Sequence, residues 1–423
     1  MIKFLLKGLL RDRSRSLLPI IVVALGVMIT VFMHAYLSGV FGESLEKTAN
    51  FNDGHVRVET KAYAENLSQI PNDLALIGVD TLKKSLKSLY PEYSWVERVE
   101  FAGLLDVPDS AGNTRMQGAV VGKGIDLLNS EEEIKRMELR KLLVKGKFPS
   151  KAGEVLLSDE LFEKLKLQLN DVVTLISSTM FGEMAMHNFT VAGTLHFGVN
   201  VLDRGMMIAD IKDIQTALNM EDAAGLVLGF FNNNVYNNKH AEKTNADFNK
   251  RYENDVDKFA PVMSSLAENG IMGISYSFIK NLAGFIILVF IFAMSIVLWN
   301  AGLISGLRRY GEFGLRLAIG ENKKEIYRSL IWEAALVGII GTIIGTILGL
   351  SVSWLMQEYG INMSNITKNS SIMMSDTIRA QITPTTWFIG LIPGIVSTVV
   401  GAMLAGIGIY KRQTANLFKE LQN

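Results

Sequence analysis

The 423-residue chain is 49 % hydrophobic, has a mean hydropathy of +0.24, and carries 42 acidic and 42 basic residues. This length allows more than one domain, and the apolar content is high for an average soluble protein, so a membrane protein is predicted. The chain contains no cysteine. A disulfide framework, a thiolate metal site and a cysteine nucleophile are therefore excluded, while the compartment is left open.

Four uninterrupted apolar runs are long enough to cross a bilayer as helices. A span needs about 20 predominantly apolar residues, and such runs cover residues 16–40, 282–306, 331–355 and 387–410. The first run follows a basic segment, as the core of a signal peptide would. It is longer than the roughly 7–15 residues of such a core, and no clear A-x-A cleavage site follows it. We therefore interpret it as an uncleaved first span.

Lysine and arginine are unevenly distributed around these spans. The N-terminal segment, the loop between the second and third spans, and the C-terminal tail are all basic, whereas the loop between the third and fourth spans offers only Lys368 and Arg379. By the positive-inside rule the three basic segments are cytoplasmic. Both termini are then inside, and residues 41–277 are outside. That segment holds 34 acidic and 25 basic residues, which argues against nucleic acid as a partner.

The segment between the first two spans has the pattern of a folded α+β domain. Strands are predicted in HVRVET, MQGAVVG, EVLLS, DVVTLIS and NFTVAGTL. Residues 158–169 predict a helix with Leu161, Leu165 and Leu169 on one face. The polar tract 231–262 is expected to be a surface loop that leads into a long amphipathic helix before the second span.

The sequence shows no catalytic motif. It lacks GxxxxGK[ST], HExxH and GxSxG, and its five histidines are scattered without the spacing of metal ligands. His55, which follows Gly54, is expected to be a half-buried or surface side chain that opens a strand. We therefore expect no catalytic, cofactor-binding or metal-binding residue in this chain.

The loop between the second and third spans has a pattern that charge alone does not explain. In "GLRRYGEFGLRLAIGENKKEIYRSLIWE", Glu312 and Arg316 lie one helical turn apart, Gly320 ends that turn, and a second helix is expected to begin at Glu321. Two short helices that meet at a glycine predict that residues 307–330 form a compact, rigid segment to which a partner protein can bind; this segment is called the knob. The alternative is a loop whose cations serve only to set the topology.

Two further groups of residues lie in the spans. Glycines recur at every fourth position of the third span, which predicts close packing against another helix, at Gly341, Gly345 and Gly349. Large apolar side chains on the first two spans are candidates for a lateral, lipid-like cavity, although lipid contact explains them equally well. These residues are Met28, Phe32, Met33 and Phe285.

The loop residues carry a resemblance to a known family. Paired arginines, followed by the glutamate, glycine and arginine of the knob and a polar helix entering an apolar span, resemble the MacB/FtsX-like family of ABC transporter permeases. The N-terminal segment resembles that family's elbow helix and first span, and residues 146–211 resemble the membrane-distal part of its outer domain. The layout is most similar to the lipoprotein-releasing permease subunits LolC/LolE, and "GHVRVETKAYAENLSQIP" is similar to the stretch after their first span.

The resemblance implies a division of the chain and a set of partners. The division is a cytoplasmic elbow helix at 1–15, the four spans, a MacB-like periplasmic core domain at 41–277, a coupling loop at 307–330, a short outer loop at 356–386 and a tail at 411–423. The implied partners are a cytoplasmic ABC ATPase dimer that binds ATP and Mg²⁺ in trans, a second permease copy or paralogue, the lipid bilayer, a lipoprotein substrate and a periplasmic carrier. The residues implied to contact the ATPase are Arg308, Arg309, Glu312, Gly314, Arg316, Gly320, Glu321 and Lys323.

Three functions are compatible with this resemblance. The favoured one is a non-catalytic inner-membrane subunit of a mechanotransmission-type transporter that releases lipoproteins. A second is an efflux permease for small toxins or peptides that works with an adaptor and an outer channel. A third, as in FtsX, is a regulator that passes ATPase motion to a cell-wall hydrolase, although the outer segment is larger than such a regulator needs.

Overall fold

The computed structural model describes residues 13–109, 112–253, 255–268, 270–307, 310–362 and 377–411. Within these residues the chain divides into two compact units, each described separately below. The helical unit contains the described residues up to Gly42, Ile279–Asn362 and those from Thr377 onward. The α/β unit contains Glu43–Phe278. The predicted elbow helix at 1–15 and the tail at 411–423 fall almost entirely outside the described residues.

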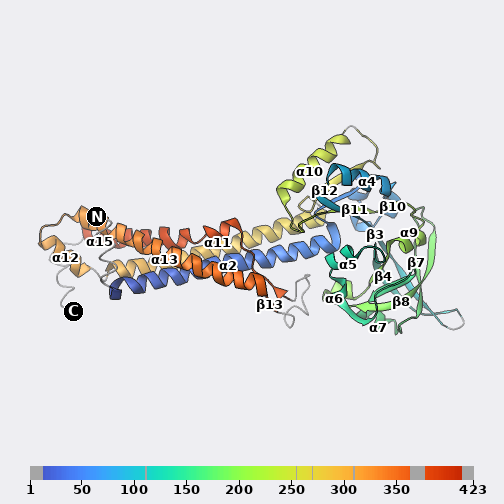
Figure 1. Cartoon of the computed structure of the whole chain (residues 1–423), viewed down its shortest axis with the longest axis horizontal. Helices are drawn as coiled ribbons and strands as arrows, with labels where there is room; N and C mark the ends of the chain where they lie inside the picture. The colour runs from blue at the N-terminus through green and yellow to red at the C-terminus, as the bar shows by residue number, and fades with distance from the viewer. Residues whose placement is uncertain are drawn as a thin grey trace. The chain divides into compact units, whose positions relative to one another are not determined.

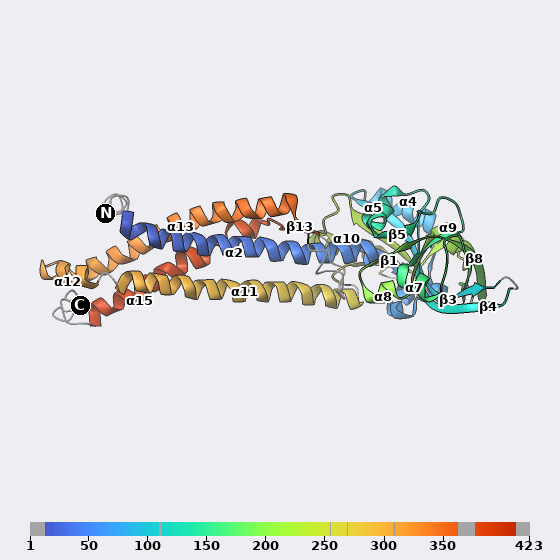
Figure 2. The ribbon, with the colours of Figure 1, turned by 90° about the horizontal axis from the view of Figure 1, so that it is seen from below.

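The helical unit is built from helices that lie lengthwise against one another (Figures 1 and 2). They are α2 (Arg13–Thr48), α11 (Gly270–Leu307), α12 (Tyr310–Ala318), α13 (Lys323–Tyr359), η4 (Pro384–Trp387), η5 (Ile392–Ser397) and α15 (Thr398–Lys411). A short β13–β14 pair joins Ile361–Asn362 to Thr377–Ile378. Val23, Val27 and Val31 of α2 form a buried seam with Leu298 of α11.

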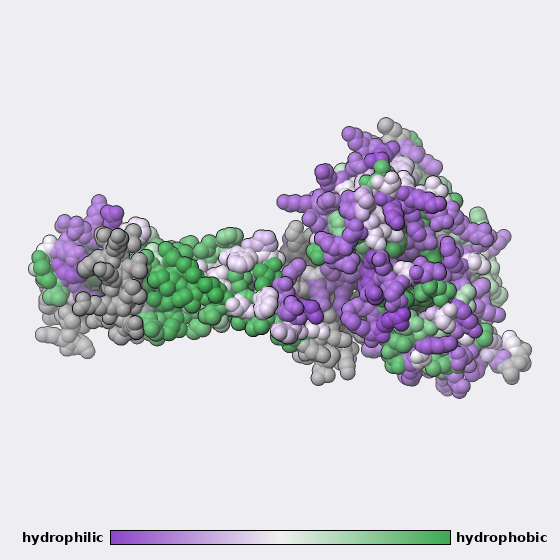
Figure 3. Space-filling view, in the orientation of Figure 1, coloured by the Kyte–Doolittle hydropathy of each residue, from purple (hydrophilic) through white to green (hydrophobic). Residues whose placement is uncertain are grey.

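Four segments of these helices are long and apolar enough to cross a membrane. They are Leu17–Asp53, Asn281–Ile304, Lys323–Tyr359 and Pro384–Ile407. Figure 3 shows apolar surface along these helices. Phe292 and Trp354, which lie in the second and third of these segments, are 65 % and 55 % exposed. Apolar side chains this exposed are stable when lipid or another protein covers them. Helices α2 and α13 both continue beyond the apolar runs that predicted them.

The α/β unit is organised around one long strand that belongs to two sheets. Strand β3 pairs through its first half with β11, and the order continues to β1 and β12. Through its second half it pairs with both β4 and β7, and the ladder β3-β4-β9-β6-β8-β7 returns to β3 as a closed ring. Closure of this kind removes exposed sheet edges. The strands are β1 (Val56–Thr60), β3 (Tyr93–Pro108), β4 (Thr114–Ile125), β5 (Leu143–Gly146), β6 (Glu154–Ser158), β7 (Val172–Ser178), β8 (Met184–Leu195), β9 (Met206–Asp210), β11 (Leu226–Phe231) and β12 (Pro261–Ser265).

Helices cover the two sheets of this unit and close its core. They include α4 (Val79–Leu89), α5 (Glu131–Arg136), α6 (Leu139–Leu142), α7 (Asp159–Lys164), α8 (Asn200–Asp203), α9 (Ile211–Ala217) and α10 (Asn238–Arg251). The five predicted strand segments all contain strands, and the predicted fold class is confirmed: four candidate membrane helices with a large mixed domain between the first and second.

Two predictions of secondary structure in this unit were wrong. The helix predicted over 158–169 ends at Lys164, because Lys166 adopts a left-handed conformation (φ 50°) that breaks the helical path, and Leu169 is 39 % exposed. The polar tract 231–262 is not a loop, since it contains the 14-residue helix α10. The side chain of Asn237 caps α10 by accepting the N–H of His240, and Phe248 is buried on the inner face of the helix.

Candidate functional site

Helix α12, in the loop predicted to contact an ATPase, ends in a Schellman motif. The N–H of Gly320 donates to the carbonyl of Leu317 (3.1 Å), and the N–H of Glu321 donates to the carbonyl of Arg316 (3.0 Å). Gly320 has φ +99°, and a Cβ at this position would meet no atom within 4 Å. The backbone conformation alone therefore requires glycine there.

An ion pair closes the same turn. The Nε of Arg316 donates to Oε2 of Glu321 at 2.6 Å, and its Nη2 donates to the other carboxylate oxygen. Helix α13 begins at Lys323 and not at Glu321, because Asn322 at its N-cap is extended (φ −69°, ψ 136°). Glu321 therefore lies in the turn between α12 and α13, where it pairs with Arg316, and is not the first residue of α13.

Helix α12 is anchored by one aromatic side chain. Phe313 is 1 % exposed and packs with Ile326 and Leu330 of α13 and with Ala402 of α15. Replacement of a buried phenylalanine by alanine lowers the free energy of unfolding by about 3–5 kcal/mol. The contacts of Phe313 are therefore strong enough to hold a helix as short as α12 in place. The knob is consequently fixed to two of the long helices.

The residues predicted to contact an ATPase do not all lie on the surface of the knob. Gly314 is buried, Glu312, Arg316, Glu321 and Lys323 are half-buried, and Gly320 is exposed. Arg308 and Arg309 lie outside the described residues. The exposed surface instead includes Leu315 and Ile319, at 52 % and 78 % exposure. Sequence reasoning missed this pair, although its i, i+4 spacing was visible.

The three glycines of the third span lie directly against α2. A Cβ built on Gly341 would lie 2.7 Å from the Cβ of Val23, one on Gly349 would lie 2.8 Å from the Cβ of Val31, and one on Gly345 would overlap the backbone of Ala24. Real Cβ atoms do not approach so closely, so only glycine permits this separation of the two helices.

Another glycine of α13 faces the fourth candidate span. A Cβ on Gly338 would lie 2.7 Å from Oγ1 of Thr398 and 2.9 Å from the carbonyl oxygen of Gly394. Gly394 lies in the π-helical turn η5, which contains Pro393. A proline removes one helical hydrogen bond, and such turns accommodate the change. Helix α13 is therefore packed closely on both α2 and the η5–α15 segment.

The four side chains predicted to line a cavity differ in their surroundings. Met28, Phe32 and Met33 are half-buried on α2, and the ring of Phe32 stacks on that of Tyr36 with 6.3 Å between centroids. Phe285 on α11 is 64 % exposed. Lining of a substrate cavity by these residues remains a prediction.

The last turns of α2 belong to the α/β unit and are tied to its sheet by a buried histidine. His55 is fully buried, and the prediction of a half-buried or surface side chain was wrong. Its Nδ1 accepts the N–H of Phe231 at 2.9 Å, so Nε2 carries the proton and donates to Glu46 at 2.9 Å. Glu46 also accepts the N–H of Tyr236. The glycine–histidine pair that opens the first strand thus fastens α2 to β11.

A buried arginine fastens the end of the same helix to β3. The π-helical turn η1 (Ala49–Asp53) continues α2, and Arg98 donates from Nη1 to the carbonyl of Phe51 (2.8 Å) and from Nη2 to that of Asn50 (2.9 Å). The same guanidinium is paired with Glu133 at 3.0 Å. Arg98 is fully buried, and fully buried charges are found in proteins only when they are paired.

The carboxyl group of Glu100 lies in this charged environment. Burial alone would raise the pKa of Glu100, but the charge and hydrogen bond of Lys123, with smaller effects of Arg98, hold that pKa below its usual range. The ionisation of Glu100 is therefore linked to folding.

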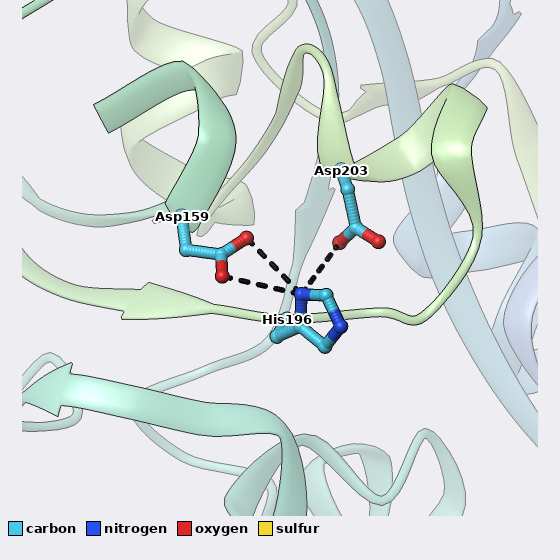
Figure 4. Close-up of side chains that lie close together, drawn as sticks. All are labelled: Asp159, His196 and Asp203. Carbon is cyan, nitrogen blue, oxygen red and sulfur yellow. Dashed lines mark hydrogen bonds and ion pairs between the residues drawn. The ribbon is translucent and has the colours of Figure 1, made fainter. Parts of the chain in front are cut away.

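A separate cluster of titratable side chains lies where β6 and β8 end. Figure 4 shows His196 between the carboxylates of Asp159 and Asp203. Its Nδ1 lies 3.2 Å from Oδ2 of Asp159 and 3.7 Å from Oδ1 of Asp203. These three side chains offer the ligand types of a metal site, with ligand atoms that lie within 4.8 Å of one another. Their positions in the sequence had suggested no such grouping.

Comparison with protein families identifies the class of the C-terminal region. Residues 284–414 match the family described as FtsX-like permease C-terminal. This match covers the knob, α13, the η5–α15 segment and most of α11. The C-terminal region is therefore similar to FtsX-like permeases.

Individual relatives support the same class. The chain is 25 % identical over 264 residues to the lipoprotein-releasing system transmembrane protein LolC of Xylella fastidiosa strain Temecula1, a match that covers 60 % of this chain and 61 % of the relative. It is 24 % identical over 266 residues to the protein of the same name from strain 9a5c, covering 61 % of each. The chain thus spans about three fifths of the length of these relatives. The predicted resemblance to the MacB/FtsX-like and LolC-like permeases is confirmed.

Solved structures were compared as well. The periplasmic region of MacB from Actinobacillus actinomycetemcomitans aligns with a TM-score of 0.34 and 13 % identity, covering 54 % of this chain and 94 % of that one.

Proposed function

We propose that this chain is the permease subunit of an ABC transporter, in which a separate cytoplasmic ATPase dimer supplies the energy. In this proposal the chain is not an enzyme and binds no cofactor, because ATP and Mg²⁺ are held by the partner. It lies in the inner membrane with both termini and α12 in the cytoplasm and with the α/β unit in the periplasm. The FtsX-like C-terminal region and the similarity to LolC support this class.

Close contacts within each unit, together with a helix that continues from one unit into the other, support a mechanotransmission mechanism. Phe313 fixes α12 to α13, the glycine seam fixes α13 to α2, and α2 is one uninterrupted helix whose last turns are fastened within the α/β unit by Glu46 and Arg98. Close-packed interfaces transmit displacement because they are not continuously deformable. Movement of the knob by an ATPase would therefore reach the end of α2.

The knob is the place to test this proposal. Gly320→Val forces a β-branched residue into a left-handed conformation at a cost of about 1–3 kcal/mol, and Glu312→Lys reverses a charge on α12. The double variant should insert normally and lose both the co-purifying P-loop ATPase and its coupled ATP hydrolysis.

Gly112→Val is the matched control for the knob variant. Gly112 also has positive φ (+83°) and no atom within 4 Å of an added Cβ, but it lies in the α/β unit. The control should retain the ATPase. Full ATPase binding and activity in the knob variant would mean that the loop only sets topology.

The proposed orientation has a direct test in this cysteine-free chain. Asn113→Cys in the α/β unit should react with an impermeant thiol reagent added to cells with a permeabilised outer membrane. Asn322→Cys, at the exposed N-cap of α13, should react only after the inner membrane is opened. Labelling of position 322 in sealed cells would reverse the assignment of the knob to the cytoplasm.

Helix α11 supports pairing with a second permease copy or paralogue. Only 6 % of its most apolar 18-residue window is buried within the described chain. Leu288 and Phe292 are 63 % and 65 % exposed. Lipid and a neighbouring permease helix can each cover such a surface, and we propose that both do so on different faces.

For the cargo, we propose release of lipoproteins to a periplasmic carrier. Leu104 of β3 is opposite Ile176 of β7, which is opposite Met186 of β8, so an apolar row crosses three strands on an exposed sheet face. The β7–β8 hairpin adds Phe181 and Met184, at 69 % and 75 % exposure. Exposed apolar patches mark docking surfaces, and methionine adapts to varied partners. A carrier that shields acyl chains has the matching chemistry.

Depletion of the protein tests this cargo. Outer-membrane lipoproteins should remain in the inner membrane, and drug susceptibility should change little. Replacing Phe181 and Met184 with Glu should reproduce the sorting defect, whereas Val256→Glu, at a 94 % exposed valine elsewhere in the unit, should not. Macrolide or peptide sensitivity with normal lipoprotein sorting would favour the efflux function instead.

A further inference from the structure

The cluster of Asp159, His196 and Asp203 arises from the way two parallel strands end. Ser158 of β6 and Leu195 of β8 are paired in register, so the next residue of each strand, Asp159 and His196, emerges at the same edge. Asp203 is the last residue of α8, and Figure 4 shows that its carboxylate faces the same ring nitrogen.

Hydrogen bonds orient both carboxylates toward the histidine. Oδ1 of Asp159 accepts the N–H of Glu160 at 2.9 Å, and the two carboxylate oxygens face Nδ1 of His196, Oδ1 at 3.3 Å and Oδ2 at 3.2 Å. Oδ1 of Asp203 accepts the N–H of Phe197 at 2.6 Å, and the Asp203 side chain is only 3 % exposed. Outer hydrogen bonds of this kind are typical of metal-ligating carboxylates.

We propose that Asp159, His196 and Asp203 bind one Zn²⁺ ion, with water at a fourth position. Ligands about 2.0–2.2 Å from a tetrahedral Zn²⁺ are separated by about 3.3–3.6 Å, and the distances of 3.2 and 3.7 Å from the ring nitrogen fall close to that spacing. One imidazole and two carboxylates suit Zn²⁺, whereas Mg²⁺ and Ca²⁺ prefer oxygen ligands alone.

The exposure of the ligands permits an ion to enter from solvent. The side chains of His196 and Asp159 are 44 % and 25 % exposed, whereas that of Asp203 is buried. An ion bound here would join α7, α8 and the end of β8. The site is independent of the proposed transport function.

The test uses the full-length protein in detergent, with any polyhistidine tag removed and bound metal stripped with a chelator. Competition with a chromophoric chelator should give one Zn²⁺ per chain, and Zn²⁺ should raise the melting temperature. Loss of an outer hydrogen-bonding partner alone weakens metal sites by about 10–100-fold, so loss of a ligand in His196→Ala or Asp203→Asn should weaken binding at least about tenfold.

Two further variants make the outcome decisive. His240→Ala is the matched control, because His240 pairs with a single carboxylate, Glu92, at 3.3 Å on the surface, and it should bind Zn²⁺ as the wild type does. Asp159→Asn removes only a partly exposed ligand, so it tests the site if the buried variants fail to fold. Absence of stoichiometric Zn²⁺, or equal affinity in wild type and Asp159→Asn, would show that His196 serves only as an ion-pair partner.

Discussion

Replacement of Arg98 by Met should loosen the joint between α2 and the sheet of the α/β unit. Methionine has similar length and can fill the space, but it donates no hydrogen bond. The variant would leave the carbonyls of Asn50 and Phe51 without their Arg98 donors, and Glu133 would keep its pair with Arg136. The perturbation therefore removes polar contacts while volume is nearly conserved.

The expected magnitude follows from burial. Arg98 and Glu133 are 0 % and 1 % exposed, and removal of one partner of a buried ion pair costs about 3–5 kcal/mol. For a domain of about 150–250 residues, each kcal/mol lowers the melting temperature by about 2–4 °C, so the α/β unit should melt about 6–20 °C lower. Arg140→Met is the control, because its pair with Glu131 is 58 % and 50 % exposed and should contribute little.

Hydrogen exchange of the full-length protein, read by mass spectrometry, locates the effect. Amides in η1 and β3 should exchange faster in Arg98→Met than in wild type, with α12 and α13 unchanged, and Arg140→Met should match wild type throughout. The contrary result is that Arg98→Met and Arg140→Met show the same melting temperature and the same hydrogen-exchange protection of η1. In that case the buried Arg98–Glu133 pair does not hold the end of α2 to the sheet, and the proposed mechanotransmission path has no such contact at its periplasmic end.

Two other predictions concern packing and pH. Gly345→Leu should separate α13 from α2, because even a Cβ would overlap the backbone of Ala24, and it should lower the melting temperature in detergent, whereas Gly284→Leu, with no atom within 4 Å of an added Cβ, should not. The pKa of Glu100 is lowered, so its contribution to stability is present above its unfolded pKa of about 4.3 and is lost as pH falls through the folded value. Lys123→Met should therefore lower the free energy of unfolding at pH 7. On acidification the free energy of unfolding should fall less in this variant than in the wild type. An unchanged acid limb in Lys123→Met would contradict this assignment.

The sequence alone determined the features that depend on local composition. Four spans could be predicted because a bilayer requires an apolar run of a certain length wherever it occurs. Strand segments such as residues 154–158 and 172–178 were predictable from β-branched runs, and the break at Gly320 from a glycine between two helical patterns. The start of α13 at Lys323 could not be predicted from the sequence, because it depends on the ion pair between Arg316 and Glu321 in the preceding turn.

Only the tertiary structure decided which distant side chains come together. Arg98 and Glu133 are 35 residues apart, and His196 and Asp159 are 37 apart; in the sequence each reads as an ordinary solvated group. The closed ring β3-β4-β9-β6-β8-β7 depends on strand register over similar separations. Register is set by burial of whole sheet faces and not by any local signal, which is why the buried joint of α2 and the edge that gathers the three candidate zinc ligands became visible only in the folded chain.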